Sequence, residues 1–517
     1  MCQIDEEYAV HVELHEKSVV SVMQKCMRCK EGAAVVIIRV GDAFCKDCFK
    51  DYFVHKFRAM LGKNRLIYPG EKVLLALSGG AASSALLRQV QEGLSREAPK
   101  KLRFIPGIVH IDEGGLTSQS LEDRQDVLFQ LESVFKASGF PYYILSLEEV
   151  FDLPTSILQR EPAFIQHGRS YKDAVDGFIH QHISQHDSNV TLQESPLSER
   201  LCQLGIQDSL QEDVQATGTG AGVHHKCTFS ARQTTSLRSL FSSVKSLTSK
   251  EELLQNLRNH LILHVARAHG YSKVMFGDSC TRLAVKLLTN ICQGRGAFLA
   301  ADTGFSDNRY GDPILVRPMR DYSSKEIAFY NKLFNVPSVF VPSLDTKISE
   351  KASIHRLTES FICKLQSDFP STVSTIYRTS EKLNVAPSSS AELSETTERC
   401  LLCLCTLDTH VGEASSFHAT VLSEKLSQRK SADHICATAS TEGAEKEPSN
   451  SKSFTNTEFL ALLCYSCRVI IKDMVTPTQL PQYVVLEADH RIRRAKMREE
   501  IQDFLICKED ERTTAKP

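Results

Sequence analysis

The sequence predicts an α/β fold: a core built on a parallel sheet, preceded by a four-cysteine zinc ribbon and followed by a zinc-knuckle region. The first observation is that short apolar runs alternate with amphipathic helical stretches between residues 71 and 385. This pattern is typical of parallel strands joined by right-handed crossovers. The second is a Ser-Gly-Gly turn directly after the first apolar run. The third is that CxxC pairs, a common arrangement of metal ligands, stand on both sides of the core.

Length and composition narrow the class of protein. A chain of 517 residues has room for two or three domains. The formal net charge is −2, so any surface for nucleic acid has to be local. The acidic N-terminus lacks the apolar stretch of a signal peptide, and we expect no membrane segment. The 17 clustered cysteines indicate metal binding in a reducing compartment, and hence a cytosolic or nuclear protein.

Composition shifts along the chain predict the domain boundaries. The polar stretches are expected to be disordered because they lack enough apolar residues to form a core. The predicted order is a mobile N-terminus (1–20), a zinc ribbon (21–50), a basic helical linker (51–70), the first part of the core (71–184), a polar insertion (185–245), the second part of the core (246–385), a split CxxC module (398–470) with a disordered insert (408–456), and a basic tail (471–517).

The first cysteine group has the spacing of a small zinc ribbon. Cys26 and Cys29 form one CxxC pair, and Cys45 and Cys48 form another, with fifteen residues between the pairs. Four thiolates close a tetrahedral Zn²⁺ site, which is structural because it leaves no open position for a substrate. The alternatives are four unrelated buried thiols, or an iron–sulfur cluster, which thiolates also suit.

A basic stretch follows the ribbon, on a segment with a helical apolar stripe. Lys and Arg gathered on one side of a helix suit a phosphate backbone, whereas a solvated helix face is the plainer interpretation. The candidate residues are Lys56, Arg58, Lys63 and Arg65.

The Gly-rich turn is the candidate phosphate site. The apolar run at residues 73–77 predicts a strand buried on both faces, and the two glycines after it let the backbone approach an anion closely. Ser83 and Ser84 are expected to cap the next helix, whose N-terminus favours negative charge. The plainer interpretation is a tight turn without a ligand. The nucleotide-binding candidates are Ser78, Gly79, Gly80, Ser83 and Ser84.

Further strands complete the predicted sheet. The second ends in Asp112 and Glu113, and polar residues at the carboxyl end of a strand lie where open α/β sheets bind ligands. Arg317 and Arg320 follow the last strand and are candidates for binding phosphates, with surface ion pairing as the alternative. The predicted strands are residues 102–111, 142–147, 271–276 and a run that ends near 316.

Other cysteines are candidates for metal binding or thiol chemistry. Cys227 lies at the edge of the polar insertion and Cys280 follows the fourth strand; a buried thiol is the plainer interpretation of Cys280, because its pKa decides its reactivity. Beyond the core, two more CxxC pairs predict a second zinc site, with Cys405 as a spare or alternative ligand. The predicted ligands are Cys400, Cys403, Cys464 and Cys467.

The turn after the first strand resembles the PP-loop of ATP-pyrophosphatases, nucleotide-adenylating enzymes that include tRNA thiolases. The family pattern is SGGxDS, and this chain has Ala82 at the acidic position. Where the thiolases carry GHNxDD, this chain has Thr281 and Arg282 at the acidic positions. The segment 317–330 matches the family pattern of RPLR followed by KEIxxY. With the flanking cysteine groups, these features resemble the second subunit of the eukaryotic cytoplasmic tRNA 2-thiolation complex over most of the chain.

The resemblance implies a PP-loop (adenine nucleotide alpha hydrolase-like) core and a part in 2-thiolation of the wobble uridine, U34, of tRNAs for Lys, Glu and Gln in the cytoplasm. In that reaction ATP adenylates uridine C2, and a ubiquitin-like carrier supplies sulfur as a thiocarboxylate. Because the loop acids are missing, we expect a non-catalytic subunit with structural zinc. It would form a heterodimer with a catalytic PP-loop subunit, which binds ATP and Mg²⁺, and would help to bind tRNA.

Two alternatives stay open. One is an active adenylating thiolase whose Mg²⁺ is held by Asp112, Glu113 or Asp278. The other is a zinc scaffold that has lost ATP binding. Under the resemblance, the basic candidates named above become candidates for tRNA binding, and Cys227 and Cys280 become candidates for sulfur transfer.

Overall fold

The structure is a computed structural model of the 517-residue chain. The residues it describes are 24–38, 41–95, 98, 101–117, 119–160, 171–186, 230–344, 349, 351–383, 399–407, 456–472, 474 and 477–501. The chain divides into two compact units, Met1–His55 and Lys56–Pro517, with the boundary inside helix α1 (Lys46–Asn64).

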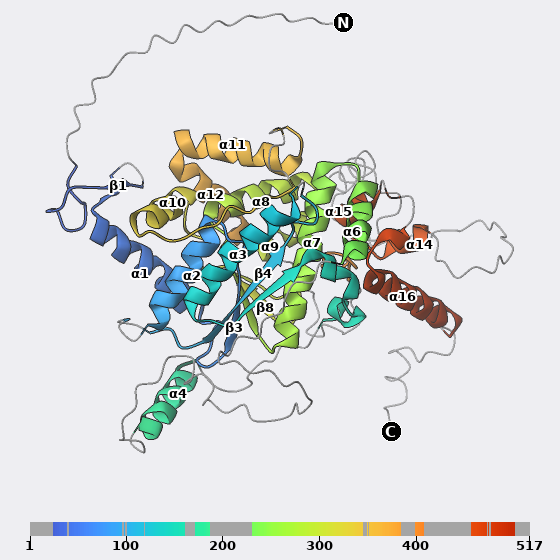
Figure 1. The fold of residues 1–517 in the computed structure, drawn as a ribbon, viewed down its shortest axis with the longest axis horizontal. Helices are drawn as coiled ribbons and strands as arrows, with labels where there is room; N and C mark the ends of the chain where they lie inside the picture. The colour runs from blue at the N-terminus through green and yellow to red at the C-terminus, as the bar shows by residue number, and fades with distance from the viewer. Residues whose placement is uncertain are drawn as a thin grey trace, which may run out of the picture. The chain divides into compact units, whose positions relative to one another are not determined.

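A six-stranded sheet forms the centre of the larger unit (Figure 1). The strands lie in the order β5-β4-β3-β6-β8-β7, and every neighbouring pair is parallel except β7 with β8. The predicted parallel α/β core is therefore confirmed. The strands are β3 (Lys72–Ala76), β4 (Ile105–Asp112), β5 (Tyr142–Ser146), β6 (Lys273–Phe276), β7 (Ser306–Asp307) and β8 (Ile314–Val316).

Helices cover both faces of the sheet. On β4, Val109 belongs to the same apolar cluster as Leu261 of α7 (Leu247–Ala268). The next residue, His110, contacts Phe135 of α3 (Leu121–Ser138), with ring centroids 6.2 Å apart. Because successive side chains of a strand point to opposite faces, α7 and α3 lie on opposite sides of the sheet.

The order in which strands are added across the sheet reverses between β3 and β6. From β3 the chain continues outward to β4 and β5, whereas β6 continues in the other direction to β8. The carboxyl ends of β3 and β6 therefore meet at a topological switch point, where open α/β sheets bind ligands. Gly277, just after β6, is close to the turn that follows β3: a Cβ on Gly277 would lie 3.0 Å from the carbonyl oxygen of Ala82.

The chain forms further helices, the longer of which are labelled in Figure 1. They are α2 (Ala81–Leu94), η1 (Leu147–Asp152), η2 (Thr155–Leu158), α4 (Tyr171–His186), α6 (Ala231–Ser243), α8 (Cys280–Cys292), η3 (Gly296–Phe298), α9 (Leu299–Thr303), α10 (Ser324–Leu333), α11 (Ile354–Asp368), α12 (Pro370–Thr379), η4 (Ser380–Lys382), α14 (Asn456–Ala461), α15 (Tyr465–Ile471), η5 (Pro477–Gln479) and α16 (Gln482–Glu500).

The smaller unit contains a short antiparallel ribbon. β1 (Val36–Ile37) pairs with β2 (Ala43–Phe44), and α1 begins directly after Cys45. Phe44 stacks on Tyr52 of α1, with ring centroids 5.1 Å apart. This contact fixes the first turns of α1 against the ribbon.

The structure corrects two expectations from the sequence. Ser83 and Ser84 do not cap α2, because Gly80 is already the N-cap; their hydroxyls donate to the carbonyls of Gly80 and Gly79, at 2.9 and 3.3 Å. The predicted polar insertion 185–245 contains α6, whose buried Leu237, Leu240 and Phe241 pack into the core. Residues 187–229, with Cys227, lie outside the described residues, as do 1–23 and 408–455.

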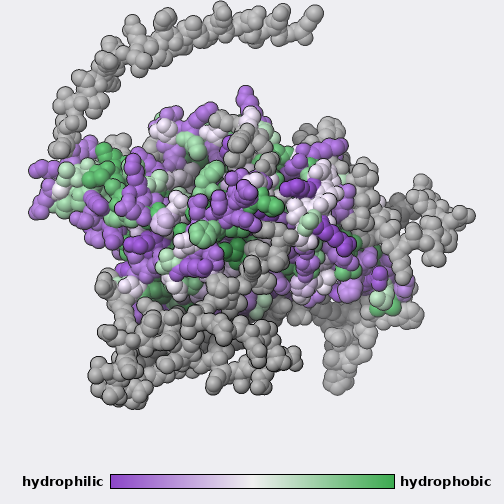
Figure 2. Space-filling model, viewed as in Figure 1, coloured by the Kyte–Doolittle hydropathy of each residue, from purple (hydrophilic) through white to green (hydrophobic). Residues whose placement is uncertain are grey.

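The surface in Figure 2 carries purple hydrophilic residues interspersed with smaller green apolar patches. Large apolar side chains that are exposed include Phe129 and Phe340. Single residues of this kind are common on protein surfaces and need no partner. Among the described residues, none of the helices combines the length and the apolar character needed to cross a membrane.

Candidate metal centres and phosphate loop

The first four cysteines converge on one point. The sulfurs of Cys26, Cys29, Cys45 and Cys48 all lie within 4.8 Å of one another, and those of Cys29 and Cys45 are 3.9 Å apart. A tetrahedral ion with metal–sulfur bonds of about 2.3 Å places its sulfurs about 3.8 Å apart. Gly32 makes this approach possible, because a Cβ there would lie 3.0 Å from the Cβ of Cys45.

The thiols of this group differ in acidity. Burial alone would raise the pKa of Cys26, but hydrogen bonds from the backbone of Cys29, Cys45 and Arg28 outweigh it and lower the pKa to about 6. Hydrogen bonding with Cys45 is the largest effect that raises the pKa of Cys48 to about 12. Without a cation, one thiolate therefore discourages the next from ionising. A bound metal removes this conflict because it deprotonates its thiol ligands.

The second cysteine group also converges. The sulfurs of Cys400, Cys403, Cys464 and Cys467 lie within 4.8 Å of one another, and those of Cys403 and Cys464 are 3.5 Å apart. Cys464 directly precedes α15, and Cys467 lies in its first turn. Three of the four are buried. Both groups have the size of one tetrahedral ion, whereas in a cubane cluster each thiolate binds a different iron and the sulfurs are spread farther apart.

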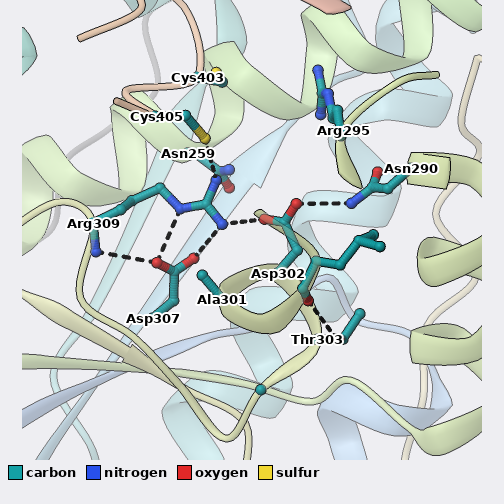
Figure 3. Close-up of polar contacts among 12 residues, drawn as sticks. Asn259, Asn290, Arg295, Ala301, Asp302, Thr303, Asp307, Arg309, Cys403 and Cys405 are labelled. Carbon is teal, nitrogen blue, oxygen red and sulfur yellow. Dashed lines mark hydrogen bonds and ion pairs between the residues drawn. The ribbon is translucent and has the colours of Figure 1, made fainter. Parts of the chain in front are cut away.

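Cys405, the spare ligand of the sequence prediction, belongs to a different arrangement (Figure 3). Its sulfur accepts a hydrogen bond of 3.0 Å from Nη1 of Arg309. The same guanidinium pairs with Asp302 and, at 2.8 Å, with Asp307; Asp302 also accepts a hydrogen bond of 2.8 Å from Asn290. These groups are mostly buried and connect the cysteine module to α9 and β7. The four-sulfur group is complete without Cys405.

The turn after β3 has the backbone shape of a phosphate loop, but its Gly79 is packed against neighbouring segments, whereas Ser78 and Ala81 of the same turn are exposed. Gly79 has φ +83°, and a Cβ on it would lie 2.6 Å from Cδ2 of Leu131. Its carbonyl accepts a hydrogen bond of 2.9 Å from the backbone N–H of Val339. The cavity between the loop, α3 and residues 337–339 measures about 10 Å³. This is roughly the space of one water molecule.

The carboxylates near the strand ends are all in ion pairs. Asp112 accepts a hydrogen bond of 2.6 Å from Nε of Arg124, whose two other nitrogens donate to Glu148 at 3.0 and 3.1 Å. Glu113 pairs with Arg258. All three carboxyl side chains are at most 13% exposed. These groups therefore already have cationic partners.

Asp278 completes this pattern at the end of β6. Its carboxylate lies 3.4 Å from Nε of Arg317 and 3.8 Å from Nε of Arg282. Arg282 stands where the thiolases have an acidic residue, so this chain has a cation there, close to the carboxylate of Asp278. The hydroxyl groups of the loop also contact each other: the Oγ atoms of Ser78 and Ser83 lie 3.4 Å apart.

Cys280 is the one candidate sulfur-handling thiol within the described residues, since Cys227 lies outside them. It is buried at the start of α8, where its N–H donates to the carbonyl of Tyr322 at 2.7 Å. Burial is the main cause that raises its pKa to about 11. A reactive cysteine needs a lowered pKa and access to solvent, so this environment is that of an inert thiol.

The basic candidates fall into two groups. Lys56 pairs with Glu326 at 2.7 Å, and Arg317 is 3% exposed and donates to the carbonyls of Ala301 and Gly304. These two side chains stabilise the interior. Arg58 is half-buried, and Lys63 and Arg65 are exposed. Arg320 is buried, and its Nη2 donates to the carbonyl of Thr303 at 3.3 Å.

Sequence reasoning missed two features of this site. Arg124 neutralises Asp112 and Glu148 across 12 and 24 residues, and a buried arginine gives no signal in a helical pattern. The segment at 337–341, which packs against Gly79, is an apolar stretch after α10 with no motif. Its role depends on a backbone hydrogen bond that any residue type can make.

Comparisons with known proteins agree with the resemblance. Residues 353–469 match the family Cytoplasmic tRNA 2-thiolation protein 2. Relatives with that name from Danio rerio and Homo sapiens are 52% and 47% identical, covering 98% and 99% of this chain and 99% of each relative. A solved structure of the U34-tRNA thiolase NcsA from Methanococcus maripaludis, with its 4Fe–4S cluster, is 14% identical and covers 73% of this chain and 95% of that one. Its TM-score of 0.44 is too low to establish a shared fold by itself. From the full-length identities, the chain belongs to the cytoplasmic tRNA 2-thiolation protein 2 family.

Proposed function

We propose that this chain is the supporting subunit of a cytoplasmic complex that 2-thiolates U34 of tRNAs for Lys, Glu and Gln. It forms a heterodimer with a catalytic PP-loop subunit, which binds ATP and Mg²⁺ and adenylates the uridine. Sulfur comes from the thiocarboxylate of a ubiquitin-like carrier. The membership of the family supports the thiolation role, and the geometry of the phosphate loop supports the division of labour.

The observation that carries this proposal is the packing of other segments against Gly79 of the loop. A phosphate site needs outward-pointing backbone N–H groups and room for the anion. Here Leu131 and Val339 lie against Gly79, and the cavity beside it has room for roughly one water molecule. A phosphate would have to displace these side chains before it reached Gly79, whereas Ser78 and Ala81 of the same turn are exposed.

The charged groups support the same division. Mg²⁺ binds carboxylate oxygens, and adenylation needs the metal beside the phosphates. The side chain of Ala82 has no oxygen to offer, and Asp112, Glu113 and Asp278 are each paired with an arginine. An active adenylating enzyme would have to break these ion pairs.

The two four-cysteine groups are proposed to hold structural Zn²⁺. Their sulfurs have tetrahedral spacing, and with four protein ligands no position stays open for a substrate. The metal would fix the ribbon that precedes α1 and join the 400–403 turn to α15. The chain's own contribution to sulfur transfer is then architectural, in keeping with the raised pKa of Cys280.

The proposal is tested by reconstituting thiolation from purified parts. The chain alone, the catalytic subunit alone and their mixture are assayed with tRNA, ATP and thiocarboxylated carrier, and ATP binding is measured for the chain alone. We expect thiolation from the mixture and no ATP turnover by this chain. Ala82→Asp, which restores the loop acid, is expected to leave the chain without turnover, because Leu131 and Val339 still pack against Gly79.

A loop variant provides the internal comparison. Ser78→Ala with Ser83→Ala in this chain should leave thiolation by the mixture unchanged, whereas the same change in the loop of the catalytic subunit should abolish it. Thiolation by this chain alone would contradict the proposal. So would a loss of activity in the Ser78→Ala and Ser83→Ala variant without a loss of stability.

A further inference from the structure

A surface rich in arginine lies where the last helix, α16, leaves the core. The first half of α16 packs on the core through Tyr483, Val484 and Ala488, whereas every residue from 493 to 501 is exposed (Figure 1). Residues 491–498 contain five cations and no carboxylate. The segments that contribute to this surface all belong to the unit Lys56–Pro517.

Helical spacing places three of these cations on one face. Arg491, Arg494 and Arg498 follow one another at intervals of three and four residues, so they lie on successive turns of the same side of α16 and form an arginine stripe. The stripe spans about 10 Å of the helix axis, because the helix rises about 1.5 Å per residue. It continues the line of the buried Val484 and Glu487, so the arginines begin where the packing on the core ends.

The other cations of the exposed half lie on a different side and have carboxylate partners. Arg493 lies 3.6 Å from the carboxylate of an aspartate one turn earlier, and Lys496 lies 2.8 Å from that of a glutamate in α14. Arg494 and Arg498 are exposed, and no carboxylate in the described part of the chain pairs with either of them. The two sides of the same helix therefore differ in how their charge is balanced.

Two further segments bring arginines to the base of the stripe. The short helix η2 packs beside α16, and Arg160, which follows η2, is exposed. Arg399, directly before the second cysteine group, donates through Nη1 to the carbonyls of Arg309 and, at 3.2 Å, Leu404. The carbonyl of Arg399 in turn accepts a hydrogen bond from Arg491. These carbonyls hold the guanidinium groups in place and carry no net charge.

The charges of these arginines act on one another. Burial is the main cause that lowers the pKa of Arg399, and the charges of Arg160, Arg309 and Arg491 lower it further, against an opposite effect of Cys405. Because arginine stays charged at any working pH, this direction indicates crowded cations and no change of charge. Arg309 and Arg491 each have a carboxylate partner, whereas Arg160 and Arg399 have none among the residues that the structure describes.

We propose that the arginine stripe, with Arg160 and Arg399 at its base, binds the phosphate backbone of RNA. The proposal rests on the proposed function for its choice of RNA. Guanidinium groups match phosphate oxygens in geometry, and a linear series of them along a rigid helix fits successive phosphates better than a single free anion. Contacts to phosphates fix register and carry no sequence information. The stripe thus holds tRNA on the complex without selecting among tRNAs.

The test measures tRNA binding by the full chain, alone and mixed with the catalytic subunit, by fluorescence anisotropy at several salt concentrations. The variant is Arg494→Gln with Arg498→Gln. The matched control is Arg493→Gln with Lys496→Gln, which removes the same charge from the other side of the same helix. We expect the variant to bind roughly tenfold or more weakly, and the slope of log K against log salt to fall by about one to two.

The control is expected to lose at most about threefold in affinity, since it removes charge without touching the proposed phosphate contacts. Both variants should keep the melting temperature of the wild type, because the positions are exposed and glutamine is a good helix former. Arg160→Gln tests the segment after η2 and should lower the salt slope by about one. An unchanged slope would overturn the assignment of Arg160.

Three outcomes would overturn the proposal as a whole. The first is unchanged tRNA affinity in the variant. The second is an equal loss in the variant and its control, which would attribute binding to the net charge of the helix. The third is a variant that binds tRNA normally but loses the catalytic subunit, which would assign the stripe to an acidic protein surface. If the wild-type mixture fails to thiolate tRNA, the proposed function fails. If it thiolates tRNA and the variant binds as the wild type does, only the assignment of the stripe fails.

Discussion

Replacing Arg124 with methionine should strongly destabilise the larger unit. The guanidinium donates to Asp112 and, with two nitrogens, to Glu148, and the three side chains are 4%, 6% and 1% exposed. Burial would lower the pKa of Arg124, but Glu148 and Asp112 outweigh this and raise it. Methionine fills similar space but leaves two buried carboxylates without a cation. Removing one partner of a buried pair costs about 3–5 kcal/mol.

Urea unfolding followed by circular dichroism gives the free energy for this comparison. The control is Arg88→Met, because Arg88 pairs with Glu92 on the surface of α2, with side chains 46% and 23% exposed. Exposed pairs of this kind contribute about 0.5 kcal/mol or less. Arg124→Lys should fall between the two, since one ammonium cannot span both carboxylates. If Arg124→Met lost no more stability than Arg88→Met, the interpretation of this cluster as a required charge balance would be wrong.

Three further predictions concern the metal, the loop and pH. Cys403→Ser should remove one metal equivalent from the second cysteine group and lower the melting temperature, because structural metal binding is coupled to folding. Metal analysis checks this prediction, and Cys363→Ser, which changes an exposed thiol on α11, is the control. Gly79→Ala should lower the free energy of unfolding by about 2–5 kcal/mol, because Gly79 has a positive φ and a Cβ there would clash with Leu131. Gly62→Ala, where the new Cβ meets open space, should leave the free energy of unfolding unchanged or raise it by up to about 1 kcal/mol. Urea unfolding measures both. Burial lowers the pKa of His260 from 6.5 to about 4, so the unfolded state binds more protons between these values; stability is retained above pH 6.5 and falls as the pH decreases toward 4. His260→Gln should remove about 2 kcal/mol of the loss between pH 7 and pH 5, measured by urea unfolding at each pH, and an unchanged pH profile would contradict this origin.

The sequence by itself determined the parallel α/β core, the two cysteine groups and the family. Apolar runs such as 73–77 have a period that is set locally by strand geometry, and CxxC spacing is set by the reach of a short turn around one metal. Both signals are contained within a few residues, so they survive without tertiary information. The prediction of the helix cap was wrong. Ser83 and Ser84, the expected N-caps, lie inside α2, because Gly80 already has the extended conformation that precedes the helix.

Only the tertiary structure decided which charges and surfaces remain available. Lys56 and Arg317 looked like the other basic candidates in sequence, but Glu326 and the carbonyls of Ala301 and Gly304 hold them in the interior. Arg160 and Arg491 are more than 300 residues apart in sequence, and only the packing of η2 beside α16 brings them to one surface. Ion pairs and packing against the loop depend on distances across the fold, and a residue's own neighbours in sequence do not encode them.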